Sequence, residues 1–186
     1  EVAIERLWEA RSNNERLLVY GDYDADGITS TALLVEALTE LGWDVQAYLP
    51  GRFDDGYGLS PISVEKCMRQ FEINLLLAVD CGSTSNEAID CLNKNNIDVI
   101  VLDHHQLSTP PPKPVAIVNP QLNNNYPNFQ ELCSVGLAFK LIHAIVKKGR
   151  QEGLQKERDL DLKQYLDLVA IGTVTDLVPL VGENRK

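Results

Sequence analysis

Short apolar runs recur along the chain at intervals that fit buried strands separated by helices. Each run is four to seven residues long and mostly Val, Ile, Leu and Ala, which is typical of strands covered on both faces. The runs span residues 16–21, 45–49, 73–79, 97–102 and 115–118. We expect one strand at each position.

Longer segments with helical periodicity separate these runs. The first, residues 26–42, has an apolar stripe and ends in Gly42, where we expect the helix to stop. The stripe consists of Ile28, Ala32, Val35, Leu38 and Leu41. Further helices are expected over residues 61–71 and 83–95. This alternation predicts an α/β fold with an open, mainly parallel sheet of about five strands and helices on both faces, over about residues 1–120.

From residue 134 onward the pattern is helical. Residues 135–149 and 162–174 have helical periodicity, which predicts a helical part over about residues 134–180. Between them, residues 149–163 are highly charged, and we expect a mobile connection there. The chain has no internal repeat and is expected to form one domain over residues 1–186. Its first residue is Glu rather than Met and its last stretch is polar, which we interpret as a piece of a longer protein.

The charge balance disfavours direct attraction to a polyanion. The net charge is −10, from 17 Lys and Arg against 27 Asp and Glu, so a nucleic-acid role would require metal ions or a basic surface outside this chain. The four cysteines have neither CxxC spacing nor the density of a disulfide scaffold. No apolar run is long enough for a membrane span, and no signal-peptide pattern opens the chain. A cytoplasmic protein without membrane association is expected.

Acidic residues and histidines follow three of the predicted strands. Asp22, Asp24 and Asp26 come after the first strand, Asp80 closes the third, and the trio 103–105 (Asp-His-His) closes the fourth. The carboxyl ends of parallel strands meet at one edge of a sheet, where ligands bind in such folds. Carboxylates gathered there without cations would destabilise the fold, so divalent metal ions are the simplest explanation.

The ligand types indicate the metal. Carboxylates with one or two imidazoles suit Mn²⁺ or Mg²⁺ better than zinc, which more often binds His and Cys. The number of ligands exceeds the need of one ion, so we expect two ions bridged by a shared carboxylate. Such pairs commonly hydrolyse phosphoesters.

The stretch GDYDADGITS (residues 21–30) has features in common with three other kinds of site. A calcium loop begins in the same way, but its twelfth position, counted from Asp22, is Leu33, where a carboxylate is required. An aspartyl-phosphate phosphatase also has DxD after a strand, yet it leaves the trio 103–105 unexplained. A polar turn with Asp26 or Thr29 as the helix cap leaves the same trio unexplained.

Several single residues have open assignments. Arg52 is either a phosphate clamp or a loop arginine paired with Asp54 or Asp55. His143, in an apolar helix, is expected to be a core or surface histidine. His104 and His105 are adjacent, so on a strand end they are expected to face opposite ways, one toward metal and one toward substrate or a supporting carboxylate.

The start of the first helix is expected to contact a phosphate. Gly27 is expected to allow a sharp turn into that helix. The first N–H groups of the helix, with Thr29 and Ser30, would then face a phosphate.

Four motifs in this order, GDYDADG, VDCGS, LDHH and GTVTDLVPL, resemble the DHH phosphoesterase family. Within it, the extra acidic residue Asp22, the loop PGRFDDGYGLS and the segments VGLAFKL and AIGTVTDLVPLVGENR are similar to the RecJ-type branch of single-strand-specific 5′-to-3′ DNA exonucleases. The resemblance covers nearly the whole chain and implies a Rossmann-like DHH domain.

The resemblance implies a role for each matching residue. Two divalent cations, Mn²⁺ or Mg²⁺, would be held by six residues, with Asp80 bridging them: Asp22, Asp24, Asp26, Asp80, His104 and Asp176. Asp103 would orient the histidine pair, His105 would position the scissile phosphate and Arg52 would lie near the substrate. Asp176 is singled out by the resemblance alone, since periodicity gives it no special place.

The implied reaction is metal-dependent hydrolysis of a terminal phosphodiester of single-stranded DNA, releasing 5′-mononucleotides in repair and recombination. Helicases or single-strand-binding proteins are possible partners. RecJ-type enzymes carry a second domain, DHHA1, which is absent from this chain, so we expect most of the metal site but half of the cleft, and a fragment whose own activity is doubtful. Two alternatives stay open: a DHH phosphoesterase acting on short oligonucleotides, cyclic dinucleotides or pyrophosphate, and a metal-binding scaffold without catalysis.

Overall fold

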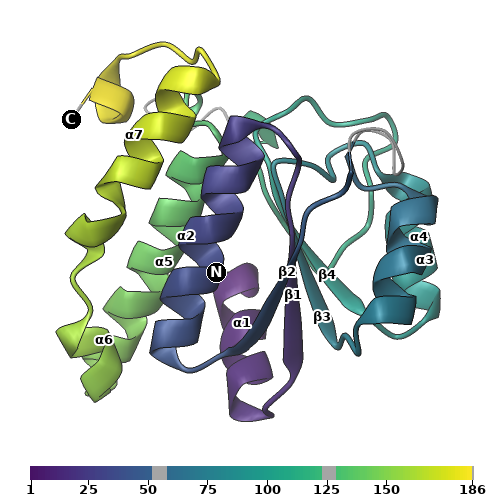
Figure 1. The fold of residues 1–186 in the computed structure, drawn as a ribbon, viewed down its shortest axis with the longest axis horizontal. Helices are drawn as coiled ribbons and strands as arrows, with labels where there is room; N and C mark the ends of the chain where they lie inside the picture. The colour runs from purple at the N-terminus through teal and green to yellow at the C-terminus, as the bar shows by residue number, and fades with distance from the viewer. Residues whose placement is uncertain (52–57, 123–128, 186) are drawn as a thin grey trace.

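A five-stranded parallel sheet forms the centre of the molecule (Figure 1). The computed structural model describes residues 1–51, 58–122 and 129–185. The strands are β1 (Arg16–Tyr20), β2 (Asp44–Tyr48), β3 (Leu75–Val79), β4 (Asp98–Leu102) and β5 (Ala116–Val118), in the spatial order β2-β1-β3-β4-β5. The expected α/β fold is therefore confirmed, with each strand within two residues of its predicted bounds.

Helices cover both faces of the sheet. One face carries α1 (Val2–Ser12), α2 (Ala25–Leu41), α5 (Ser134–Gln151) and α7 (Leu166–Thr175), and the other carries α3 (Pro61–Gln70) and α4 (Asn86–Lys94), as Figure 1 shows. Four short helical segments complete the description: η1 (Pro120–Leu122), α6 (Gln155–Asp159), η3 (Leu162–Tyr165) and η4 (Gly182–Arg185). The helical part after residue 134 thus packs on one face of the sheet as a further layer.

Alternate residues of each strand enter two separate hydrophobic cores. In β3, Leu75, Leu77 and Val79 face α2 and α5, whereas Leu76 and Ala78 face α3 and α4. Because neighbouring side chains of a strand point to opposite faces, burial on both faces requires an uninterrupted apolar run. This is the reason that the strands could be located from the hydrophobic pattern.

The buried face of α2 differs from the predicted stripe. Ile28 is 45% exposed and Ala32 is also exposed, while Leu33, Leu34 and Ala37 are buried. Both α5 and α7 pack along α2, in addition to the sheet below it. A helix that packs against several partners buries more than the single face that an amphipathic stripe predicts. The predicted stripe was wrong for its first two positions, Ile28 and Ala32.

Residues 149–163 form a packed connection, contrary to the expected mobile one. This segment contains α6, and both Glu157 and Leu160 within it are buried. The helix α1 had no counterpart in the sequence pattern, although Leu7 and Ala10 contribute to the core. His143 lies on the exposed side of α5, in agreement with a surface histidine. Within the described ranges, no helix has the length and apolar character needed to cross a membrane.

Candidate metal centre

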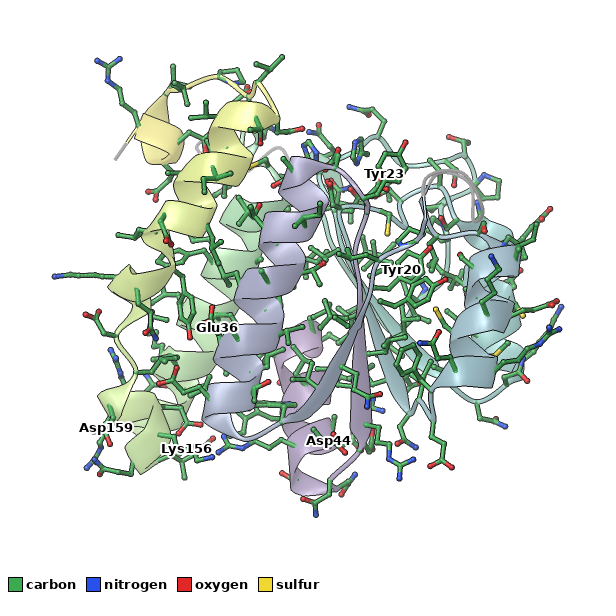
Figure 2. The ribbon with its side chains drawn as sticks, in the orientation of Figure 1. Tyr20, Tyr23, Glu36, Asp44, Lys156 and Asp159 are labelled. Carbon is green, nitrogen blue, oxygen red and sulfur yellow. The ribbon has the colours of Figure 1, made fainter. Side chains whose placement is uncertain are left out.

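The predicted site residues gather at the carboxyl edge of the sheet. Figure 2 shows Tyr23, in the loop after β1, at the upper edge, and Asp44, the first residue of β2, at the lower edge. β1 lies between β2 and β3, so the connections after β1 and β2 lead to opposite sides of β1. In open α/β sheets, ligands bind where the strand order reverses in this way, which here is between the loops after β1 and β3. The loops after β1, β3 and β4, the start of α5 and the end of α7 all contribute side chains here.

The loop after β1 carries three acidic residues in different environments. Asp22 is fully buried, and Asp24 is exposed and caps α2, since its Oδ1 accepts the Gly27 N–H at 2.9 Å. The cap is therefore neither Asp26 nor Thr29, which were the two candidates for a simple polar turn. Gly27 has a helical backbone, and a Cβ there would lie 2.5 Å from the Asp22 carbonyl oxygen. It permits close packing of α2 on the loop rather than a sharp turn.

Asp26 links α2 to the first turn of α5. Its Oδ2 accepts the Ser134 N–H at 2.7 Å and its Oδ1 accepts the Val135 N–H at 2.9 Å. The N–H groups at a helix start are free of helical partners and carry partial positive charge, so they favour a carboxylate there. The side chain of Asp26 is consequently buried and held in one position.

Asp80 is a buried carboxylate with an incomplete set of partners. Its Oδ1 accepts the Ser134 hydroxyl at 2.8 Å, whereas its Oδ2 has no hydrogen-bond partner among the described residues. Burial, with the nearby Asp26 and Asp24 charges, raises the pKa of Asp80 to about 7. The backbone of Asp80 is left-handed, with φ of 63°, a conformation that residues other than glycine adopt rarely and that is common at functional sites.

His104 lies between two carboxylates. Its Nε2 is 3.5 Å from Asp80 Oδ1 and 3.7 Å from Asp176 Oδ2, distances that leave room for a small ion rather than a short direct bond. Burial opposes a charged ring, but Asp80 and Asp176 outweigh it and raise the pKa of His104. Burial also raises the pKa of Asp176, which follows the last turn of α7.

Asp103 orients His105 through several hydrogen bonds. Its Oδ1 lies 2.7 Å from His105 Nδ1 and also accepts the backbone N–H groups of both histidines, while its Oδ2 accepts the Ser83 N–H at 3.0 Å. Burial alone would raise the pKa of Asp103, but the bonds from His105 and Ser83 hold it at about 2. The bond to Asp103 raises the pKa of His105 to about 9. The two groups form an ion pair.

The two histidine rings do not face opposite ways, contrary to expectation. Their centroids are 4.4 Å apart and the rings are tilted by 53°. β4 ends at Leu102, so the alternation of a strand does not extend to residues 104 and 105. The rings nevertheless have different partners, Asp80 and Asp176 for His104 and Asp103 for His105.

The ligand atoms form three groups that could each hold an ion, with the atoms of a group within 4.8 Å of one another. The groups are Asp22, Asp24 and Asp80; Asp80, His104 and His105; and Asp26, Cys133 and Asp176. All six residues predicted as metal ligands occur in these groups. Asp80 belongs to two of them, which is the position that a bridging carboxylate requires.

The structure does not support the predicted phosphate contacts of Thr29 and Ser30. The Thr29 hydroxyl donates to the Ala25 carbonyl at 2.7 Å and the side chain is almost fully buried. Ser30 is fully buried in α2. In the described structure neither hydroxyl is accessible to a phosphate, so we correct these two assignments. Arg52, with Asp54 and Asp55, lies outside the described residues.

Two serines that contact the site were given no role in the sequence analysis. Ser134 binds both Asp26 and Asp80, and Ser83 binds Asp103 through its backbone N–H. Ser83 is the last residue of the motif VDCGS, in which only Asp80 was assigned a role, and Ser134 lies outside the four motifs. The one available signal for Ser134 is its place at the start of an apolar helical segment, where serine commonly occurs.

Comparisons with known proteins agree with this geometry. The family model described as "DHH family, N-terminal domain" matches residues 16–173. Single-stranded-DNA-specific exonuclease RecJ of Escherichia coli K12 is 43% identical over all of this chain, which spans 33% of that relative's length. The crystal structure of exonuclease RecJ bound to manganese aligns with a TM-score of 0.83 at 38% identity, over 98% of this chain and 44% of the other.

A structure of RecJ from Thermus thermophilus in complex with Mg²⁺ aligns with a TM-score of 0.62 at 32% identity, over 98% of this chain and 21% of the other. The similar sequence covers all of the candidate metal centre, and the similar structures align with 98% of the chain. The family model covers the strands of the site and ends at residue 173, three residues before Asp176. The chain belongs to the DHH family.

Proposed function

We propose that this chain is the metal-binding domain of a nuclease that hydrolyses single-stranded DNA from the 5′ end with two Mn²⁺ or Mg²⁺ ions. The observation that carries the proposal is the shared position of Asp80 in two groups of ligand atoms. One ion would be held by Asp22, Asp24 and Asp80. The other would be held by Asp26, Asp80, His104 and Asp176.

The residues present fit such ions. Asp80 Oδ2, His104 Nε2 and Asp176 Oδ2 are buried atoms without a hydrogen-bond partner among the described residues. Leaving three such atoms unsatisfied is costly, and divalent cations would satisfy them. Oxygen ligands with a single imidazole suit Mn²⁺ and Mg²⁺. Solved RecJ structures contain manganese or Mg²⁺, which supports the same choice.

The metal ligands and His105 have different roles in the proposed hydrolysis. When bound, the ions activate water and stabilise negative charge on the phosphate oxygens. His105 is the most exposed of the site histidines, with 44% of its side chain accessible, and its ion pair with Asp103 keeps the ring positively charged at neutral pH. A charged donor at this edge would bind a non-bridging phosphate oxygen and orient the phosphodiester. Arg52 remains a candidate for the same task.

The names of the relatives support the choice of substrate, and the resemblance of the motifs supports the direction of digestion. The similar proteins are named as single-stranded-DNA-specific exonucleases, and we extend that substrate, the 5′-to-3′ polarity and a role in repair and recombination to this protein. The proposal includes a cytoplasmic location and partners such as helicases or single-strand-binding proteins. It also includes a sheet core over about residues 1–120, a helical part over about residues 134–180 and a DHHA1 domain elsewhere in the whole protein.

Degradation of 5′-phosphorylated single-stranded DNA by the full-length protein tests this proposal. We expect Mn²⁺-dependent release of mononucleotides, which Asp80→Ala and His104→Ala abolish. His143→Ala is the matched control, because His143 is an exposed histidine on α5 outside every ligand group. Hydrolysis of cyclic dinucleotides with no digestion of this DNA would contradict the proposal. Calorimetry of the chain with Mn²⁺ is expected to give two ions per chain.

A further inference from the structure

Asn119 is a buried polar residue with no part in the metal ligand groups. It follows β5 directly and is 7% exposed. A buried amide is costly unless its hydrogens and oxygen find partners. Here they do, because Nδ2 donates to Ser83 Oγ at 2.9 Å and to the His105 carbonyl at 2.8 Å, and Oδ1 accepts the Gln121 N–H at 2.8 Å.

These contacts close a ring of hydrogen bonds around His105. Asn119 binds Ser83 and the His105 carbonyl, the Ser83 N–H binds Asp103 Oδ2 at 3.0 Å, and Asp103 Oδ1 binds His105 Nδ1 at 2.7 Å. The ring joins the segments after β3, β4 and β5. Asp103 therefore fixes the imidazole of His105, and Asn119 fixes the backbone from which that imidazole extends.

Because both the backbone and the imidazole of His105 are held by hydrogen bonds, the second imidazole nitrogen, Nε2, has a defined position. Asp103 occupies Nδ1, so Nε2 is the nitrogen available to a ligand. One ring nitrogen of His105 lies within 4.8 Å of ligand atoms of Asp80 and His104, which places the ring beside the proposed metal ligands. A small displacement of a phosphate-orienting group lowers a rate strongly, because the reacting atoms must be held in line.

We propose that Asn119 is a positioning residue for His105: by closing this ring, it holds the imidazole where the scissile phosphate would bind. The catalytic part of this inference rests on the proposed function, whereas the hydrogen-bonded ring is independent of it. Asn119 hydrogen bonds to Ser83, His105 and Gln121, none of which is among the six proposed metal ligands. Its removal is therefore expected to leave the metal affinity unchanged.

The ring of hydrogen bonds is tested by NMR of the 186-residue chain, which has three histidines. In the unsubstituted protein we expect a downfield, slowly exchanging N–H signal from His105 Nδ1 bound to Asp103, assigned by its absence in His105→Ala. Asn119→Ala is expected to broaden or remove this signal. Asn86→Ala is the matched control, because Asn86 Nδ2 also donates twice, to Ser108 Oγ and the Pro110 carbonyl, outside the ring.

Kinetics of the full-length protein on single-stranded DNA test the consequence. Asn119→Ala is expected to lower kcat by about 10- to 100-fold with KM and the Mn²⁺ dissociation constant within about twofold, since loss of a supporting hydrogen bond typically has this effect. In a double-mutant cycle, Asn119→Ala added to His105→Ala should lower the rate no further. Asn119→Asp keeps the shape and the acceptor for Gln121 but lacks both donors, and it should resemble Asn119→Ala.

Two results would overturn the inference: a His105 signal unaffected by Asn119→Ala, or an effect of Asn119→Ala that adds fully to that of His105→Ala. If Asn119→Ala does not fold, Asn119→Asp decides between the outcomes by the same signal. If the unsubstituted protein has no nuclease activity, the proposed function fails, while the NMR result still decides whether the ring exists.

Discussion

Buried carboxylates occur at both ends of the sheet, and they differ in how their charge is balanced. At the amino end, the fully buried Glu157 pairs with the guanidinium of Arg11. Figure 2 shows the neighbouring Lys156 at this lower end of the molecule, as it does Asp44, the first residue of β2. The Arg11 guanidinium lies 5.1 Å and 4.7 Å from the ring centroids of Trp8 and Trp43. At the carboxyl end, Asp80 is equally buried, but the partners described for its side chain are the Ser134 hydroxyl at 2.8 Å and His104 Nε2 at 3.5 Å, with no Lys or Arg partner among the described residues.

The two ends of the sheet differ in the source of the positive charge that balances the buried carboxylate. The chain supplies the cation at the amino end, and the aromatic rings cover it, so this pair joins α1 to α6 without any ligand. At the carboxyl end the excess of carboxylates over cationic side chains is left for bound metal ions. A buried acid is thus structural where its counter-charge is covalently present, and functional where the counter-charge has to bind.

The largest expected effect is on catalysis at the carboxyl end. Asp80→Asn keeps the size and the left-handed backbone but removes the charge shared by two ions. We expect the hydrolysis rate to fall by about 10³-fold, equivalent to about 4 kcal/mol of lost charge stabilisation. Steady-state assays with Asp90→Asn, an exposed acid on α4, as the control would check this. A rate within tenfold of the unsubstituted enzyme would contradict the bridging role.

The amino end should respond in stability rather than in activity. Glu157→Gln leaves the partly buried Arg11 guanidinium, 20% exposed, without its counter-charge, and we expect the free energy of unfolding to fall by about 3 kcal/mol. Urea denaturation measures this loss, and calorimetry should find the Mn²⁺ affinity unchanged. Glu65→Gln is the control, because Glu65 and Arg69 form an exposed pair whose loss should change stability by less than about 0.5 kcal/mol.

The metal-free protein should lose stability as the pH rises, because of the carboxyl end. The pKa of Asp80 in the folded protein, about 7, lies above its ordinary value of 3.8, so the folded state binds more protons between these limits. Stability therefore falls as the pH rises toward 7, by about 2 kcal/mol from pH 5. His105, whose pKa is raised to about 9, stabilises fully below its ordinary pKa of 6.5, and this contribution disappears as the pH rises through 9.

Denaturation of the metal-free protein at pH 5, 7 and 9 would show this trend. Asp80→Asn should flatten the curve between pH 5 and 7 and leave the decline between pH 7 and 9. Saturating Mn²⁺ should flatten the first interval in the same way. A metal-free protein that is more stable at pH 7 than at pH 5 would show that Asp80 is not the dominant acid.

The smallest expected effect concerns Asp24, the exposed carboxylate of the site. Asp24→Ala removes the α2 cap and should lower the free energy of unfolding by about 1 kcal/mol. Asp24→Asn keeps the cap, because asparagine accepts the same hydrogen bond, and should leave stability unchanged. Both variants should weaken Mn²⁺ binding in titrations. Equal stability of the two variants would mean that the cap contributes little.

Local patterns were sufficient to predict the parts of the structure that depend on neighbouring residues. The strands were predictable because burial on both faces produces apolar runs, as in Leu75–Val79. The aspartates and histidines at the strand ends were predictable because parallel strands deliver them to one edge. Long-range packing was not predictable: the buried face of α2 depends on α5 and α7, which lie far along the chain from it.

Site residues held by distant partners were missed for the same reason. Asp176 is a single aspartate after a helix, and only the resemblance of GTVTDLVPL to a family motif indicated it. Ser134 and Asn119 are common residue types, and their contacts with Asp26, Asp80 and His105 are visible only when the strands and α5 are in place. Local sequence therefore predicted the proposed ligands more readily than the residues that hold the site together.

The left-handed backbone of Asp80 separates what would favour the fold from what would favour the reaction. Glycine adopts this conformation without steric cost, and an uncharged residue removes the repulsion with Asp24 and Asp26. Asp80→Gly should therefore yield a metal-free protein at least as stable as the original. Selection for thermal stability alone would favour glycine at this position. The aspartate is therefore expected to lower the stability of the fold while providing the proposed metal site, which is a trade-off between stability and activity.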